Sequence, residues 1–167
     1  MLGTYSESLR WKSHSTLAPS PADTIDDTFA FIDAAVEMMK AGDNYQAVVL
    51  RSDSGEFLGC CGLHGKGKPE TPELGIWIKT EAHGNGYGKE AIIGLKRWAD
   101  SNLAYKYLTY PVDRRNQASL RIPEALGGEV FGREAQKKVD GTTLNPKPEI
   151  IINYSIDRKQ GRRECSA

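Results

Sequence analysis

The sequence has few cysteines, no net charge and no long hydrophobic run, and each absence excludes a class of protein. Three cysteines, with Cys60 and Cys61 adjacent, cannot form the disulfide framework of a small secreted domain, because neighbours on a strand point to opposite faces. Lys and Arg number 22, as do Asp and Glu, so the overall charge does not favour a nucleic-acid partner. No segment approaches the roughly 18 apolar residues of a membrane span, and no signal-peptide pattern is visible. We therefore expect a soluble, cytoplasmic protein that binds neither nucleic acid nor membrane.

The length and composition suit a single folded domain. With 167 residues, of which 39% are hydrophobic, the chain can form one compact core, and we find neither an internal repeat nor a linker. The first residues are polar and lead to a proline-containing stretch, so no strand is predicted there. We expect an N-terminal segment at 1–23, a domain at 24–158 and a polar tail at 159–167.

Hydrophobic periodicity predicts an α/β or α+β sheet with helices packed against it. A first helix begins at a cap formed by Asp23 or Thr24 and ends near Gly42. A second helix is predicted to follow a glycine turn and to end near residue 101, and a third is predicted at 116–125. The predicted strands are 46–51, 57–63, 73–79, 107–112, a strand beginning at 129–133, and 149–156.

Between the strand at 73–79 and the next helix, glycines occupy every second position, at Gly84, Gly86 and Gly88. A strand, glycine turn and helix in this order present bare backbone N–H groups and a positive helix end to an anion, most simply a phosphate. The dinucleotide fingerprint does not fit, because Lys89 stands where its third glycine should be. A Walker loop does not fit either, because Glu90 rather than Ser or Thr follows Lys89.

Further motifs follow the glycine turn in a fixed order. They are Glu73-Leu-Gly-Ile-Trp77, the loop from His83 to Gly88, Glu90-Ala91, Asn116-x-x-Ser119 and Glu124-Ala-Leu-Gly-Gly. In this order they resemble the GNAT superfamily of N-acetyltransferases, and more narrowly its RimJ/RimL-type branch, whose named members acetylate the N-termini of ribosomal proteins. The resemblance runs from about Thr24 to Ile156. It implies the GNAT fold, a mixed and mostly antiparallel sheet with a splayed central strand pair, flanked by helices.

The sequence departs from the family pattern at two places. His83 stands where the family has Gln or Arg, which changes one side-chain contact and leaves the backbone of the loop intact. The family's first strand and most of its first helix have no visible counterpart before Trp11. A sheet edge left open in this way could pair with a partner chain, and a homodimer is one expectation.

The resemblance implies that the chain binds acetyl-CoA and that the pantetheine arm inserts between the strands at 73–79 and 107–112. Contacts to the arm are expected from Ile76, Trp77 and Ile78, and one of their N–H groups would face the thioester oxygen. The pyrophosphate is expected to bind the loop and first helical turn, which comprise His83, Gly84, Asn85, Gly86, Tyr87, Gly88 and Lys89. An exposed lysine without a special role is the alternative for Lys89.

Two further residues at the start of the helix at 116–125 acquire roles from the resemblance. Asn116 matches an asparagine that contacts the pantetheine arm. Ser119 matches a serine that lies near the sulfur, where it can protonate the departing thiolate. The structural alternatives are helix capping by Asn116 and no role for Ser119.

Glu73 is our candidate general base, because it opens the strand beside the expected split and the acceptor amine must lose a proton before it attacks. An α-amine with a pKa near 7.7 to 8 is roughly a fifth to a third neutral at pH 7.4, but a lysine near 10.4 is only about 0.1% neutral. A solvated strand-end charge is the alternative for Glu73, and His64 or His14 could also act as bases. No spacing of His, Cys and carboxylates predicts a metal site.

These observations predict an acetyl-CoA-dependent N-acetyltransferase in which a primary amine attacks the thioester directly. Cys60 and Cys61 could carry an acyl group, yet they fall in a strand with a buried pattern. The acceptor is a protein N-terminus, as the branch implies, or a small amine such as a polyamine, an amino acid or an aminoglycoside. A noncatalytic module that binds coenzyme A or acyl-CoA is the competing class.

Overall fold

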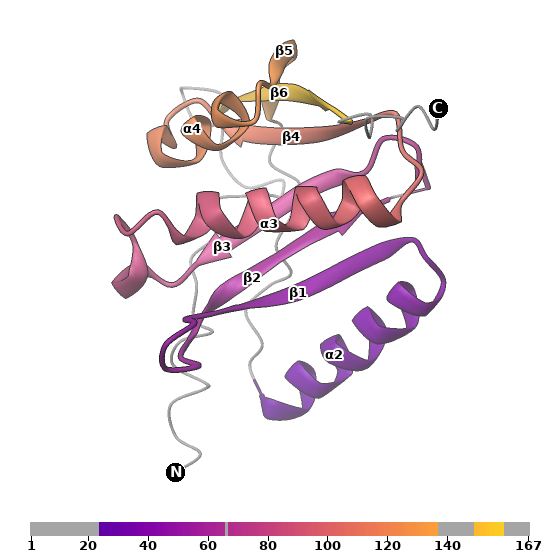
Figure 1. The fold of residues 1–167 in the computed structure, drawn as a ribbon, viewed down its shortest axis with the longest axis vertical. Helices are drawn as coiled ribbons and strands as arrows, with labels where there is room; N and C mark the ends of the chain where they lie inside the picture. The colour runs from indigo at the N-terminus through magenta and orange to yellow at the C-terminus, as the bar shows by residue number, and fades with distance from the viewer. Residues whose placement is uncertain (1–23, 66, 137–148, 159–167) are drawn as a thin grey trace, which may run out of the picture.

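The computed structural model describes residues 24–65, 67–136 and 149–158, and the N-terminal segment, the C-terminal tail and His14 lie outside this range. Within it, one six-stranded sheet has the order β1-β2-β3-β4-β6-β5 (Figure 1). The strands are β1 Asn44–Leu50, β2 Phe57–His64, β3 Glu73–Ile78, β4 Tyr107–Asp113, β5 Glu129–Gln136 and β6 Glu149–Asp157. All neighbouring strands are antiparallel except β3 and β4, which are parallel. The predicted fold class is confirmed.

The helices also lie where the periodicity predicts them, as α2 Ile25–Lys40, α3 Tyr87–Asn102 and α4 Gln117–Ala125. A short 3₁₀ helix, η1 Thr80–Ala82, follows β3 and was not predicted. In Figure 1, α3 lies across one face of the sheet, α4 lies near β4 and β6, and α2 lies outside β1. Thr24 begins α2 as the N-cap of a capping box with Asp27, as expected.

The core lies between α3 and α4 and the sheet face that they cover. Its fully buried side chains come from β2, β3, β4, β6, α3 and α4, and include Leu63, Leu74, Ile92, Leu108, Pro123 and Ile156. Because side chains alternate along a strand, the residues on either side of Leu74, namely Glu73 and Gly75, belong to the opposite sheet face. The sheet therefore has a core face, which α3 and α4 cover, and an opposite face, which we call the second face.

The central strands β3 and β4 pair only at their beginnings. Glu73 lies opposite Thr109, and the Thr109 amide donates to the Pro72 carbonyl at 2.9 Å. Among the described residues no further pair joins these strands, whereas β3 pairs with β2 along its whole length. The predicted splay of the central pair is therefore present, and we call the region where β3 and β4 diverge the split.

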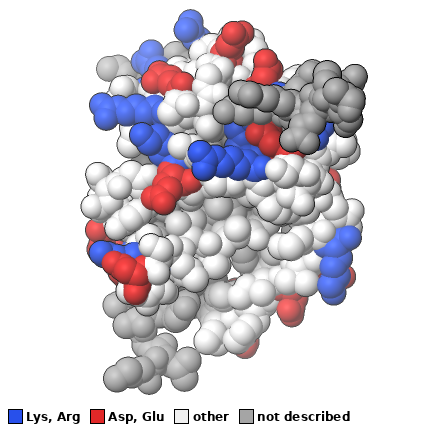
Figure 2. Space-filling view, viewed as in Figure 1, with Lys and Arg blue, Asp and Glu red and all other residues white. Residues whose placement is uncertain are grey.

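Helix α2 exposes the stripe of apolar residues whose periodicity predicts this helix. Among its described residues only Ala35 is buried, and the stripe is 40% to 58% exposed; it comprises Ile25, Phe29, Ile32, Val36 and Met39. Figure 2 shows that charged side chains are sparse across the middle and lower part of this view, over β1, β2 and α2. No helix in the described part of the chain is both long and apolar enough to cross a membrane.

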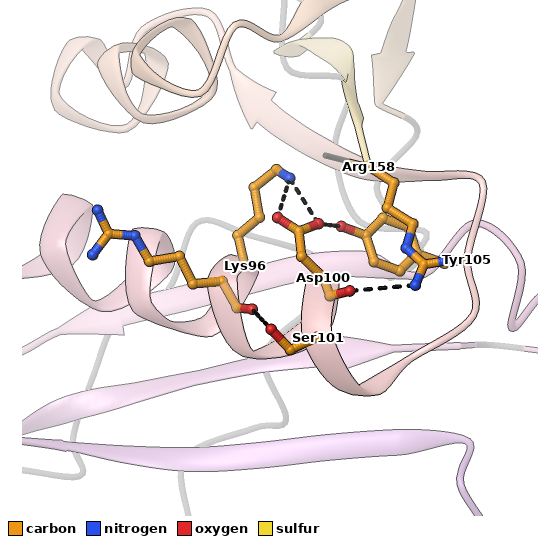
Figure 3. Close-up of polar contacts among 6 residues, drawn as sticks. Lys96, Asp100, Ser101, Tyr105 and Arg158 are labelled. Atoms are coloured by element: carbon orange, nitrogen blue, oxygen red, sulfur yellow. Dashed lines mark hydrogen bonds and ion pairs between the residues drawn. The ribbon is translucent and has the colours of Figure 1, made fainter. Parts of the chain in front are cut away.

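A buried ion pair anchors the end of α3 (Figure 3). Lys96 is only 3% exposed, and its Nζ lies 3.0 Å from both carboxylate oxygens of Asp100. The Tyr105 hydroxyl also donates to Asp100, and Arg158 donates to the Asp100 carbonyl oxygen at 3.3 Å. Because burial raises the pKa of Tyr105 and the bond to Asp100 raises it further, this hydroxyl stays protonated as a donor. The cluster thus joins α3, the segment before β4 and the end of β6.

Candidate functional site

The glycine turn after β3 is held in place by Asn85. Its side-chain amide donates to the carbonyl oxygens of Ala82 and His83 at 3.2 and 3.1 Å. Gly84 and Gly86 have φ values of 81° and 80°, in the left-handed region that favours glycine. The glycines at these two positions therefore allow the conformation of the turn, whereas Gly88 lies in the first turn of α3.

The start of α3 presents backbone donors without a capping side chain. Gly86 is the N-cap, no side chain bonds to it, and the first helical bond runs from the Glu90 amide to the Gly86 carbonyl at 3.1 Å. The amides of Tyr87, Gly88 and Lys89 are therefore the donors that an α-helix leaves unpaired at its positive end. A Cβ added at Gly84 or Gly86 would meet no atom within 4 Å, so the turn that leads to these donors is open where a side chain would project. This arrangement fits a bound diphosphate.

Gly88 brings the helix end close to the split. A Cβ added there would lie 3.6 Å from Ile78, 3.8 Å from Ile76 and 3.9 Å from Ile122, all side-chain atoms. The helix start therefore packs on β3 and faces α4, and an anion at the helix end would lie beside the diverging strands.

The His83 side chain bonds to the end of β3. Its Nε2 lies 2.7 Å from the Ile78 carbonyl oxygen, so this ring nitrogen donates. The side chain thus braces the turn in this structure, where the family has a Gln or Arg.

The backbone groups of β3 alternate between β2 and the split. The Lys79 amide donates to the Leu58 carbonyl on β2 at 2.8 Å, and the Pro72 carbonyl accepts from β4. By this alternation the backbone groups of Ile76 and Ile78 face the split, whereas those of Trp77 face β2. Ile76 and Ile78 can therefore offer their backbone groups to a ligand in the split, whereas the Trp77 backbone is directed to β2, and the predicted contacts to the pantetheine arm stay a prediction.

Helix α4 places Asn116 and Ser119 at its N-terminus. Asn116 is the N-cap, and its Oδ1 accepts from the Ser119 amide at 3.1 Å, so the capping alternative is realised. The cap uses the oxygen of the amide group and leaves the Asn116 Nδ2 as a donor. The Ser119 hydroxyl lies 2.7 Å from the hydroxyl of Tyr110 on β4.

Sequence reasoning missed Tyr110 as a partner of the site. Alternation along the strand at 107–112 places Tyr110 on the buried face with Leu108 and Val112. A buried tyrosine needs a partner for its hydroxyl, which was the available signal. The choice of Ser119 as that partner depends on how α4 packs on β4, which local patterns do not determine.

Glu73 and His64 lie side by side on the second face. They are directly opposite in the β2–β3 register, and cross-strand neighbours share a face. His64 is the last residue of β2, one residue beyond the strand predicted at 57–63, and its Nδ1 lies 3.2 Å from Asn44 Oδ1. A Cβ added at Gly75 would lie 2.9 Å from His64 Nε2, so the ring lies over this glycine. The two candidate bases, Glu73 and His64, thus lie on the second face of the sheet, whereas Ser119 lies on the core face with Tyr110.

The cysteines on β2 are poor nucleophiles. Burial raises the pKa of both Cys60 and Cys61 to about 11, so both are protonated thiols near neutral pH. This supports direct transfer over an acyl-enzyme. The described residues contain no cluster of three or more His, Cys, Asp or Glu side chains suited to a metal ion.

Comparisons with known proteins agree with this geometry. A model of the acetyltransferase (GNAT) domain family matches residues 5–129. A solved structure of a probable acetyltransferase is 25% identical, with a TM-score of 0.67, over 84% of this chain and 75% of that chain. The ribosomal-protein-S5-alanine acetyltransferase from Vibrio fischeri is 17% identical, with a TM-score of 0.71, over 86% of this chain and 79% of its own.

A third solved structure is a mutant of the spermidine/spermine N-acetyltransferase SpeG from Vibrio cholerae. It is 15% identical, with a TM-score of 0.65, over 83% of this chain and 80% of its own. A search of curated proteins gave no match.

Proposed function

Because the chain belongs to the GNAT acetyltransferase domain family, we propose that it transfers acetyl from acetyl-CoA directly to a primary amine, with a protein N-terminus as the acceptor. Family membership confirms the predicted enzyme class and acyl donor. The observation that carries the proposal is the uncapped start of α3, where open backbone donors lie beside the split. A cytoplasmic location stays a prediction.

The residues around the split have separate roles in this reaction. The loop at 83–89 holds the diphosphate through its backbone amides, and acetyl-CoA supplies an acetyl thioester when bound. Glu73 accepts a proton from the acceptor amine, directly or through water. The amide of Ile76 or Ile78 donates to the carbonyl oxygen, and the Ser119 hydroxyl donates toward the sulfur.

An α-amine suits the charges on the second face better than a polyamine does. This face of β3 and β4 carries Glu73 and Asp113, and Asp113 lies 2.5 Å from the Arg115 guanidinium. The hydrogen bond from Arg115 lowers the pKa of Asp113, so its charge is already compensated. A small polyamine remains the second candidate, because the SpeG enzyme shares the fold.

The first test is thermal stabilisation by acetyl-CoA. A ligand at one hundred times its dissociation constant adds about 2.7 kcal/mol to the free energy of unfolding, which a melting assay detects. Gly86→Glu should abolish this stabilisation, because a side chain at a φ of 80° is strained and its charge repels a diphosphate. Gly94→Ala is the matched control within α3, where a Cβ meets no atom within 4 Å. It should add about 1 kcal/mol of stability and leave the acetyl-CoA effect unchanged.

The second test is amine-dependent release of free thiol. The acceptors are a peptide with a free α-amine, the same peptide blocked at its N-terminus and carrying a lysine, and spermidine. Thiol release with the first alone supports the proposal, whereas preference for spermidine favours the second candidate. Stabilisation by acetyl-CoA without release by any amine would identify a noncatalytic binding module.

Glu73→Gln tests the base. The variant should retain stabilisation by acetyl-CoA and lose about 100-fold in kcat, within the usual range for a general base. His64→Asn, made in parallel, tests the neighbouring imidazole. A Glu73→Gln rate equal to that of the wild type from about pH 6 to 9 would show that Glu73 is not the base.

A further inference from the structure

The strongest unassigned contact near the site joins Tyr110 to Ser119. Tyr110 is 3% exposed, and its hydroxyl lies 2.7 Å from Ser119 Oγ, within the usual O–H···O range. In the part of the chain that the structure describes, Ser119 is the residue that satisfies the Tyr110 hydroxyl. The pair therefore connects the buried face of β4 to the first turn of α4.

The direction of this hydrogen bond follows from acidity and burial. Burial raises the pKa of Tyr110 despite the opposing effect of the bond to Ser119, so the phenol stays protonated. A phenol is a stronger acid than an alcohol, so the phenol is the better donor and the serine oxygen the acceptor. Once Ser119 Oγ accepts from Tyr110, its own proton must point elsewhere.

We infer that Tyr110 is a positioning residue that fixes the Ser119 hydroxyl so that its proton points toward the departing sulfur. This inference rests on the proposed function, because it assigns the sulfur of acetyl-CoA as the acceptor of a hydrogen bond from Ser119, which stabilises the departing thiolate without moving the serine proton. Tyr110 transfers no proton in this role. Its neutral hydroxyl, by donating to Ser119 Oγ, removes the arrangement in which Ser119 would donate to Tyr110 instead.

The kinetic test is a double-mutant cycle with Tyr110→Phe and Ser119→Ala. Tyr110→Phe should lower kcat about fivefold, the rate equivalent of one neutral hydrogen bond, and leave the KM for acetyl-CoA unchanged. Adding Tyr110→Phe to Ser119→Ala should then cause no further loss. Tyr154→Phe is the matched control, because Tyr154 lies opposite Tyr110 on β6 and is also buried. It should keep the kcat of the wild type.

A binding test needs no turnover. Free coenzyme A is titrated into the protein between about pH 7 and pH 9.5, a range that brackets the pKa of an ordinary thiol. A fixed donor at the sulfur lowers the pKa of the bound thiol, so the wild-type affinity should rise with pH. Tyr110→Phe should lose this rise and keep the affinity measured at pH 7, and Ser119→Ala should lose the rise as well.

The outcomes separate this inference from the proposed function. A wild type that is neither stabilised by acetyl-CoA nor active with any amine overturns both. An active wild type overturns the inference alone if Tyr110→Phe keeps full kcat, or if it slows the Ser119→Ala background as much as the wild type. An unchanged pH dependence of coenzyme A affinity in folded Tyr110→Phe overturns it as well, and a melting curve of each variant verifies folding.

Discussion

Single residues decide whether the acetyl group is first attached covalently to the protein, and the cysteines of β2, Cys60 and Cys61, are the residues to test. Since burial raises the pKa of Cys60 and Cys61 to about 11, the reactive thiolate is scarce below pH 9 and increases toward pH 11. Alkylation of the folded protein by iodoacetamide should therefore be slow at pH 7.5 and accelerate as the pH rises. Peptide mapping by mass spectrometry measures the rate at each cysteine, with urea-unfolded protein as the control.

Peptide mapping also tests direct transfer, with acetyl-CoA in place of iodoacetamide. Incubation with acetyl-CoA alone should leave both β2 cysteines unmodified, and Cys60→Ala should keep its kcat. An acetylated Cys60 that loses its label when an amine is added would contradict direct transfer and indicate an acyl-enzyme.

At the residue scale, the sequence predicted the positions that follow from local chemistry. Backbone conformations of positive φ at Gly84 and Gly86 are compatible with the local sequence, because glycine adopts this region without a steric cost. The partners of Tyr110 and His64 could not be predicted, because they depend on packing and register. Asn44 reaches His64 only because β1 pairs with β2 in one particular register, and a shift by one residue would move its side chain to the other face.

At the scale of elements, the anchoring of α3 depends on Asp100. Asp100→Ala would leave Lys96 as a buried charge without its carboxylate and would remove the acceptor of the Tyr105 hydroxyl. Breaking one side of a buried pair costs about 3 to 5 kcal/mol, because the remaining charge stays desolvated. Urea unfolding at pH 7 should show a loss of this size.

A surface ion pair provides the matched control for Asp100. Glu37 and Lys40 on α2 lie 2.7 Å apart, and both side chains are more than 65% exposed. Glu37→Ala should change the free energy of unfolding by less than about 1 kcal/mol. Equal losses in the two variants would show that the cluster at the end of α3 does not anchor the helix.

Hydrophobic periodicity predicted the elements well because each helix or strand has its own repeat. The predicted helix at 116–125 corresponds to α4, and the strand at 73–79 corresponds to β3 with a slightly earlier end. The split was predicted only through the family resemblance, since no local pattern states that two parallel strands will diverge. The direction of the Trp77 backbone needed the observed pairing of β3 with β2.

At the scale of the whole molecule, β1 is an outer strand among the strands that the structure describes, and α2 beside it exposes its apolar stripe. Open strand edges and exposed apolar patches favour association. We propose that a second copy of this chain covers this side, because an antiparallel edge strand is self-complementary about a two-fold axis. Pairing of β1 with its copy would continue the sheet and place both α2 helices at the interface.

Phe29→Glu tests this homodimer. Phe29 is 58% exposed on α2, so the substitution should leave the fold of a monomer intact and introduce a charge into the dimer interface. Phe131→Glu is the matched control, because Phe131 is 57% exposed on β5, at the opposite edge of the sheet. Analytical ultracentrifugation should show a dimer for the wild type and Phe131→Glu, and a monomer for Phe29→Glu. This interface would be contradicted by a wild type that sediments as a monomer at every concentration. It would also be contradicted if both variants dissociated equally, because a dimer formed through α2 and β1 must be more sensitive to a charge at Phe29 than to one at Phe131.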